Sequence, residues 1–228
     1  MKHSGKARKA AFKMIFITLV LVILLPVVGV LGWLISSAMV AVSVFIFLVW
    51  CLFALFTLYF FRDPNARVPA GAGLVLSPGH GKVDVIDAVT EPQFMGRECQ
   101  RISMFLSVVD VHVQNAPVSG KVAYLKATEG QFLNAMKTEC ATCNENVYIG
   151  IESTDPANEK IGVKLIAGVL ARRIIPFVAV GDELARGDRI SLIQFGSRVD
   201  VYLPHSAKIK VKLGDRVVGG ESILAAFE

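Results

Sequence analysis

The sequence lacks charge over one long stretch, since no Asp, Glu, Lys, Arg or His lies between Met14 and Phe61. A helical span of a bilayer needs about 20 apolar residues, so this run is long enough to cross twice. It is also too long for the apolar core of a signal peptide, and no small-residue cleavage site ends it at the right distance. With a mean hydropathy of +0.55 for the whole chain, the run excludes an ordinary soluble protein and predicts a retained membrane anchor.

Small residues divide the uncharged run. The segment 29–37 holds two glycines and two serines among bulkier residues and carries no charge. We therefore expect two helical spans, 14–34 and 38–60, joined by a tight turn. A single long or re-entrant span, with the rest of the chain outside, is the alternative.

Basic residues set the expected orientation. They precede the first span and follow the second: Lys2, Lys6, Arg8, Lys9, Lys13, Arg62 and Arg67. The turn carries none, so the positive-inside rule places both ends of the hairpin in the cytoplasm. We expect a protein of the cell (inner) membrane with a cytoplasmic catalytic domain. Its parts are a basic tail (1–13), a transmembrane hairpin (14–61), a linker (62–73) and a β-rich domain (74–228).

Cysteine is also scarce, with four in 228 residues, and Cys140 and Cys143 form the one pair with metal or redox spacing. No second pair or nearby histidine completes a zinc site, so we expect no metal. No basic cluster with interleaved aromatics occurs, which argues against a nucleic-acid partner. The net charge of +5 suits a position near anionic lipid head groups instead.

The part after residue 73 has the pattern of a mainly β domain. Short runs of alternating apolar and polar residues, separated by turn residues, predict strands. These runs are 74–76, 82–89, 102–108, 121–125, 147–152, 162–169 and 175–180. The one sizeable helix predicted here is 131–138, in which Phe132, Ala135 and Met136 recur at helical spacing.

One internal repeat is visible in this domain. Gly181-Asp182 and Gly214-Asp215 are each followed by another glycine six residues after the first. Such pairs are typical of the stacked turns of lipoyl-like, hammerhead β structures, where Gly supplies positive φ and Asp bonds to the turn backbone. We therefore expect an α+β, mainly β fold: a lipoyl-like, hammerhead domain behind an N-terminal two-helix transmembrane hairpin.

A Gly196-Ser197 pair lies between the two repeats, flanked by runs of alternating residues that predict strands. The surrounding segment 195–200 resembles the self-cleavage segment of the short-form phosphatidylserine decarboxylases. The resemblance continues in order through 60–64, 77–83, 110–120, 144–146 and 167–174. It thus covers nearly the whole chain from about Phe60 onward, and several ordered segments are far more specific than one short motif.

This resemblance implies a proenzyme that cuts itself between Gly196 and Ser197. The Ser197 hydroxyl would attack the Gly196 carbonyl, exchange the amide for an ester, and elimination would leave a pyruvoyl group in place of the serine. Glycine is needed because a side chain would crowd the strained intermediate. The pyruvoyl group, a covalent and self-generated cofactor, would decarboxylate phosphatidylserine to phosphatidylethanolamine through a Schiff base. The long and short chains would remain together as a heterodimer, with homo-oligomerisation left open.

Other site residues follow from the same resemblance. His112 matches the family position credited with returning a proton to the carbanion, which suits a histidine near its own pKa. Arginine forks pair with lipid phosphate, which makes four side chains candidates, each with a salt bridge at the edge of the core as its default role. They are Arg101, Arg172, Arg173 and Arg198.

Two positions depart from the long-form pattern of self-cleavage. Long-form members have Asp-Gly after the Ser-Pro pair and a second His three residues beyond the first, whereas this chain has His80 and Asn115. Asparagine at the second position is typical of the short forms, so His80 is the anomaly. Either His80 is itself the base for Ser197, or the replacement slows or stops processing and the chain is a poorly active paralogue.

The competing hypothesis from another class is a non-enzymatic membrane adaptor, a lipoyl-like β module on a helical hairpin. A lipoyl or biotin carrier would need a lysine at the tip of a β-turn, and the predicted hairpin tips offer none. An adaptor would also tolerate Ser197→Ala, which a decarboxylase would not.

Overall fold

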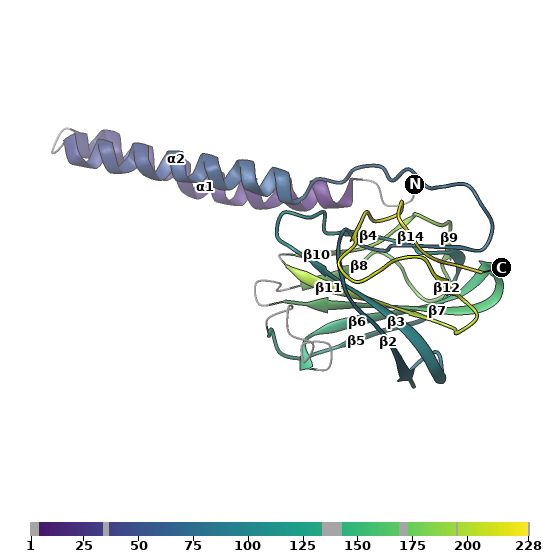
Figure 1. Ribbon diagram of the computed structural model, residues 1–228. Helices are drawn as coiled ribbons and strands as arrows, with labels where there is room; N and C mark the ends of the chain where they lie inside the picture. Colours follow the sequence, from purple (N-terminus) through teal and green to yellow (C-terminus); the bar gives the residue numbers. More distant parts are fainter. Residues whose placement is uncertain (1–4, 34–36, 134–142, 169–172, 195, 228) are drawn as a thin grey trace. The chain divides into compact units, whose positions relative to one another are not determined.

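The computed structural model describes residues 5–33, 37–133, 143–168, 173–194 and 196–227. The chain divides into two compact units, a helical one from Gly5 to Asp63 and a β-rich one from Pro64 onward. The prediction of two N-terminal helices followed by a mainly β part is therefore confirmed, and the sheets of that part are mostly antiparallel (Figure 1).

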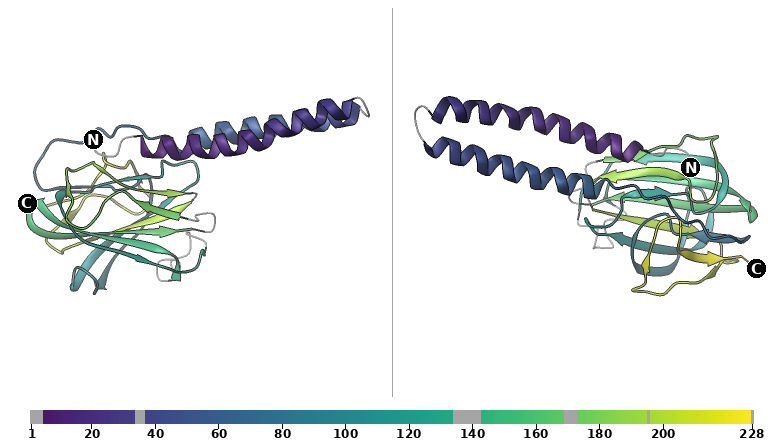
Figure 2. Two further views of the ribbon diagram at one scale, coloured as in Figure 1. Left: turned by 180° about the vertical axis from the view of Figure 1, so that it is seen from behind. Right: turned by 90° about the horizontal axis from the view of Figure 1, so that it is seen from above.

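The helical unit is a pair of side-by-side helices, α1 (Lys6–Trp33) and α2 (Ser37–Phe60), as both views of Figure 2 show. Helix α1 begins at Lys6, so most of the basic tail is itself helical rather than a separate segment ending at residue 13. In the described part of the chain, one helix, Ala38–Phe60, is long and apolar enough to span a membrane.

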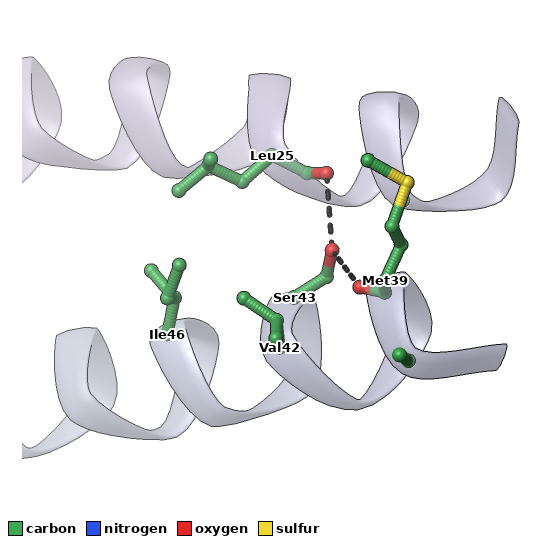
Figure 3. A pocket seen from close by; sticks show the side chains of 7 residues that line it. Leu25, Met39, Val42, Ser43 and Ile46 are labelled. Atoms are coloured by element: carbon green, nitrogen blue, oxygen red, sulfur yellow. Dashed lines mark hydrogen bonds between the residues drawn. The ribbon is translucent and has the colours of Figure 1, made fainter. Parts of the chain in front are cut away.

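Small side chains let the two helices approach closely near their turn. A Cβ on Gly29 would overlap the Ser43 side chain. The Ser43 hydroxyl bonds to the carbonyl oxygens of Met39 (2.9 Å) and Leu25 (3.4 Å), the second of which lies on the facing helix (Figure 3). Beside this contact lies an apolar cavity of about 370 Å³ between the helices. Farther along, Trp50 donates to Thr18 across the pair at 3.1 Å.

The β-rich unit contains one large and two small sheets. The large sheet has the order β13-β2-β3-β11-β7-β6-β5-β9, and the small ones are β4-β10-β8 and β1-β14-β12. The strands are β1 (Leu74–Leu76), β2 (Gly81–Glu91), β3 (Arg97–Leu106), β4 (Val113–Asn115), β5 (Ser119–Thr128), β6 (Asn146–Asp155), β7 (Ala157–Ala167), β8 (Arg173–Pro176), β9 (Glu183–Leu184), β10 (Arg189–Gln194), β11 (Ser197–Leu203), β12 (Lys208–Ile209), β13 (Arg216–Val217) and β14 (Ile223–Ala226).

Strand β11 lies at the centre of the large sheet, between β3 and β7, and all seven of its residues are buried. Val199 and Val201 belong to the main apolar core. Tyr202 belongs to a second cluster that also contains Tyr148 and Cys99. A strand buried on both faces at the centre of a sheet is a rigid support for whatever its ends carry.

Several local predictions differ from the structure. The strand predicted at 102–108 is observed at Arg97–Leu106, and the one predicted at 162–169 is observed at Ala157–Ala167. The helix predicted at 131–138 does not begin at Gln131, which forms an isolated bridge with Asn144; residues 134–138 lie outside the described residues. Both backbone groups of Leu133 bond to the Asn144 side chain at 2.9 Å, which holds this segment in a non-helical conformation. The strand predicted at 175–180 is observed at Arg173–Pro176, the length over which it pairs with β10.

The repeated Gly-Asp turns have the predicted chemistry. Four glycines have positive φ: Gly181 (99°), Gly187 (85°), Gly214 (94°) and Gly220 (73°). The Asp182 and Asp215 carboxylates each accept the backbone N–H of the residue three positions earlier, at 2.9 and 2.8 Å. The turns therefore close on themselves, as the sequence pattern indicates.

Candidate active site

The Gly196–Ser197 peptide lies where the chain passes from one sheet to another. Strand β10 ends at Gln194 in a small sheet, and β11 begins at Ser197 in the large one. Gly196 has a φ of +67°, a conformation that glycine adopts without the steric cost of a Cβ. The sharp change of direction therefore falls on the residue before the serine.

The two reacting groups of the expected self-cleavage differ in their bonding. The Gly196 carbonyl oxygen accepts the backbone N–H of Gly168 at 3.1 Å. The Ser197 hydroxyl is fully buried and has no hydrogen-bond partner among the described residues. Leaving a buried hydroxyl without a partner costs about 1–3 kcal/mol, and such exceptions in a folded core call for an explanation.

His112 lies against the same peptide segment and is fully buried. Its Nε2 accepts the Gly196 N–H at 3.2 Å, and its Nδ1 lies 2.9 Å from the Asp110 carbonyl oxygen. An amide N–H only donates and a carbonyl only accepts, so the ring is neutral with its proton on Nδ1. The His112 carbonyl accepts the Ile193 N–H at 3.1 Å, which fixes the residue to β10.

His80 and Asn115 lie next to each other beside the Gly219–Gly220 turn. A Cβ on Gly219 would lie 2.9 Å from His80 Cδ2 and 3.1 Å from Asn115 Oδ1. The Asn115 amide donates to the Gly187 carbonyl at 2.9 Å. Among the described contacts, His112 is thus the histidine bonded to Gly196, and the Ser197 hydroxyl is bonded to neither His80 nor His112.

The segment that carries His80 nevertheless reaches the face of the sheet on which Ser197 lies. A Cβ on Gly79 would lie 3.5 Å from Val199 Cγ2, and residues two apart along a strand share a face. The structure therefore places the two histidines differently: one bonds to the Gly196 backbone, and the other belongs to a segment packed over the same side of β11.

The predicted phosphate-binding arginines have different surroundings. Arg198 is buried and its guanidinium donates twice to Asp84, at 2.7 and 2.8 Å. Arg101 forms a two-bond pair with Asp87 (2.6 and 2.9 Å) and lies opposite Tyr202, at the end of β11 remote from Ser197. Arg173 is exposed and pairs with Gln194, two residues before Gly196. Arg172 lies outside the described residues.

Gly168 has a part in the site that the sequence pattern does not predict, although it belongs to the resembling segment 167–174. Its contribution is a backbone N–H at the end of β7, and a backbone donor leaves no trace in the pattern of side chains. The available signal was the pairing of β7 with β11, in which Ala167 lies opposite Ser197.

These contacts define a class of protein. A buried serine hydroxyl, next in the chain to a carbonyl that already accepts a backbone N–H, is the arrangement that a self-processing proenzyme needs for attack by serine on the preceding residue.

Comparison with known proteins gives the family. The family profile described as phosphatidylserine decarboxylase matches residues 53–225. The phosphatidylserine decarboxylase proenzyme of Symbiobacterium thermophilum is 41% identical over 206 residues, which cover 87% of this chain and 95% of that protein. The proenzyme of Ruegeria pomeroyi is 40% identical over 198 residues (82% and 90%), and that of Desulfotalea psychrophila is 43% identical over 169 residues (74% and 78%). The chain therefore belongs to the phosphatidylserine decarboxylase family.

Proposed function

We propose that Gly196–Ser197 is the bond at which this phosphatidylserine decarboxylase proenzyme cleaves itself. The observation that carries the proposal is the buried Ser197 hydroxyl, which has no hydrogen-bond partner in the described part of the chain and lies beside a carbonyl that the Gly168 N–H polarises. Attack by Ser197 Oγ on the Gly196 carbonyl carbon would exchange the amide bond for an ester. Elimination of that ester would release a chain ending at Gly196 and a short chain of 228 − 196 = 32 residues.

Gly168 and Gly196 would lower the barrier to the first step. A backbone N–H on the carbonyl oxygen stabilises the negative charge that develops there during attack, and removing one such donor typically costs about 10²–10³ in rate. Gly196 already has the left-handed backbone conformation, so the chain is bent sharply at the reacting carbonyl before reaction.

The residues present fit the pyruvoyl group that the family uses. Position 197 supplies the serine from which the group is made and lies at the end of a buried strand, so the group would be held rigidly and away from bulk water. Once formed, the pyruvoyl ketone supplies an electron sink for decarboxylation of phosphatidylserine to phosphatidylethanolamine.

We assign the two histidines to different steps. The Nε2 atom of His112 faces Gly196 while its Nδ1 is held by the Asp110 carbonyl, so His112 would take up a proton from solvent at Nε2 and return it to the substrate carbon after CO₂ leaves. His80 would act as the base for Ser197 during self-cleavage, with Asn115 beside it; the packing of the neighbouring Gly79 against Val199 supports this assignment.

The two assignments predict different defects. His80→Ala should leave the chain at full length, whereas His112→Ala should yield the two chains but no decarboxylation. Intact mass and release of labelled CO₂ from serine-labelled lipid measure the two steps separately. Normal processing of His80→Ala would contradict the role given to His80, and an active His112→Ala variant would contradict the role given to His112.

The helical unit and the substrate suggest where the enzyme works. We infer that α1 and α2 form a transmembrane hairpin with both ends in the cytoplasm, because basic residues flank the pair and the turn carries none. The exposed Arg173 is the strongest candidate for the lipid phosphate, since Arg101 and Arg198 are already paired with carboxylates. The repeated turns support a lipoyl-like, hammerhead arrangement of the β-rich unit, and the segment 195–200 supports the short form of the family.

One experiment tests the central proposal. Freshly purified wild-type chain should give two masses, with a pyruvoyl group in place of an amine at the start of the short chain, whereas Ser197→Ala should stay whole and release no CO₂. A wild-type chain that stays whole would show that His80 has impaired processing. Undiminished lipid conversion by Ser197→Ala would overturn the proposal.

A further inference from the structure

The Gly196–Ser197 peptide lies at the side of the large sheet where the ends of four other strands also lie, and we call this row of strand ends the Ser197 edge. In the register of the sheet, Ser197 lies between Leu106 of β3 and Ala167 of β7. The ends of β6 and β5 lie beside the end of β7, because Asn146 of β6 pairs with Ile166 of β7 on one side and with Thr128 of β5 on the other. With about 4.8 Å between neighbouring strands, β3 and β5 end within about 20 Å of each other.

Two loops leave this edge, 107–112 after β3 and 129–133 after β5, and both present large apolar side chains to solvent. We call these side chains the apolar rim: Val108 (37% exposed), Val109 (51%), Phe132 (41%) and Leu133 (36%). The rest of the described β-rich unit has four exposed large apolar side chains spread over its other loops: Val68, Val180, Leu213 and Val218.

Both loops are held in place by hydrogen bonds. Ser107 and Asp110 bond to each other twice at 2.9 Å, through the Asp110 N–H and through the Asp110 carboxylate. On the other side, the Asn144 amide donates to the carbonyls of Leu133 (2.9 Å) and Ala167 (2.6 Å). The rim is therefore fixed to the backbone that surrounds Gly196. Val108 is the nearest side chain to the space that a Cβ on Gly196 would occupy, at 3.8 Å.

Exposed apolar side chains scattered singly need no explanation, whereas a group around a functional site marks an interaction surface. The substrate of this family is a phospholipid, and its reacting head group lies at the surface of a bilayer. Two exposed basic residues lie close to these strand ends, where they would attract anionic lipid. Lys82 lies at the start of β2, opposite Phe105 of β3, and Arg173 begins β8 of a small sheet, opposite Gln194, two residues before Gly196. A bilayer surface therefore fits the apolar rim better than a protein partner does.

We propose that the apolar rim inserts into the lipid head-group region and brings the Ser197 edge onto the bilayer. The inference rests on the proposed function, because it uses Gly196–Ser197 as the place where the lipid reacts. It adds a second membrane contact, made by the β-rich unit itself, to the one expected from the helices.

Site-specific fluorescence tests the insertion without relying on activity. The full chain, in a background without native cysteines, would carry an environment-sensitive dye at Val109→Cys or Leu133→Cys and be reconstituted into vesicles of phosphatidylcholine and phosphatidylserine. The matched control is Val180→Cys, which is 60% exposed. Val180 lies far from the rim. Its neighbour Gly181 bonds to Val122 of β5, and at about 3.3 Å per residue Val122 is about 20 Å from Thr128, the end of β5 near the rim.

Lipids that carry a shallow quencher should quench both rim dyes several-fold more than the dye at position 180, and aqueous iodide should do the reverse. Quenching by the lipid-borne group identifies lipid as the contact, because a second copy of the chain covering the rim would protect the dyes from iodide without exposing them to that quencher. Equal quenching at all three positions would overturn the proposal.

A kinetic comparison separates this inference from the proposed function. Val109→Ser and the double variant Phe132→Ser, Leu133→Ser should lower kcat/KM on bilayer substrate by about tenfold, yet match wild type on monomeric short-chain phosphatidylserine. Val180→Ser should match wild type on both substrates. Equal losses on both substrates, or none, would contradict insertion of the rim, whereas a wild-type chain inactive on both would contradict the proposed function instead.

Discussion

At the scale of single residues, β11 carries a buried carboxyl group, Asp200, three residues after the reactive serine. Asp200 is fully buried, and neither carboxylate oxygen has a hydrogen-bond partner among the described residues. The Nε atom of Arg198 lies 3.8 Å from Oδ1, at the limit of an ion pair. Burial raises the pKa of Asp200 above its ordinary value; Ser103, which lies opposite Asp200 but outside good hydrogen-bond geometry, and Arg198 offset only part of this effect. The carboxyl group therefore binds its proton more tightly in the folded chain than in the unfolded one.

The sign of the pH dependence follows from this shift. Where the folded state binds more protons than the unfolded state, stability falls as the pH rises, so Asp200 destabilises the fold once the pH exceeds its ordinary pKa. We expect Asp200→Asn to raise the free energy of unfolding at pH 7 by about 1 kcal/mol or more and to have a smaller effect near pH 4. Denaturant titration in detergent, on a Ser197→Ala background that keeps one chain, measures both values.

The matched control is Asp84→Asn on β2, which β3 separates from β11 in the sheet. Asp84 accepts two bonds from the buried Arg198, so its removal should lower stability by about 1–3 kcal/mol by leaving that charge poorly paired. A stability gain from Asp84→Asn, or a loss from Asp200→Asn at pH 7, would show that the two carboxylates have been assigned the wrong energetic roles.

At the scale of elements, the segment between the two units is irregular but held to the β-rich unit. The Arg186 guanidinium donates to the carbonyl oxygens of Gly71 (2.7 Å), Leu74 (3.2 Å) and Pro69 (3.4 Å). Arg189, which is buried, donates to the Asn65 side chain at 3.0 Å. Two arginines therefore fix the segment predicted as a linker to the β-rich unit, and we call its residues 64–73 the strap.

Removing one arginine should free the strap. We expect Arg186→Ala to increase tryptic cleavage after Arg67 several-fold, because three backbone carbonyls lose their donor at once, and to lower stability by about 1–3 kcal/mol. Arg186→Lys should recover only part of the protection, since an ammonium lacks the planar fork. Arg97→Ala, which removes an exposed pair with Glu159, is the control and should change neither quantity. Unchanged cleavage in Arg186→Ala would mean that other contacts hold the strap.

How much could be predicted from sequence also differs between elements. Alternation predicts the strand at 74–76 with the bounds observed, and the Gly-Asp pairs predict their turns, because both signals are local. The bounds of β3 and β8 and the non-helical backbone at Leu133 depend on partners far away in sequence, which a local pattern does not contain. The same limit applies to the site: motifs indicate Ser197 and His112, whereas the Gly168 N–H and the Arg198–Asp84 pair depend on strand register.

At the scale of the whole molecule, cleavage after Gly196 would divide the fold through its centre. The short chain would supply β11, which pairs along its length with β3 and β7 of the long chain. It would also supply β13, which pairs with β2, and β14, which pairs with β1. Each of these four pairings crosses the new chain boundary, so the short chain cannot leave without opening the large sheet and its apolar core.

We therefore expect the processed chains to remain together as a heterodimer through size-exclusion chromatography in detergent at any dilution that preserves the fold. They should separate only at the denaturant concentration that unfolds the β-rich unit, because the contacts that join them are those of the core itself. Mass spectrometry of the eluted peak, compared with far-UV circular dichroism across the same titration, tests the coincidence. Release of the 32-residue chain well before the β signal is lost would contradict the central position of β11, since a strand bonded on both sides cannot dissociate from an intact sheet.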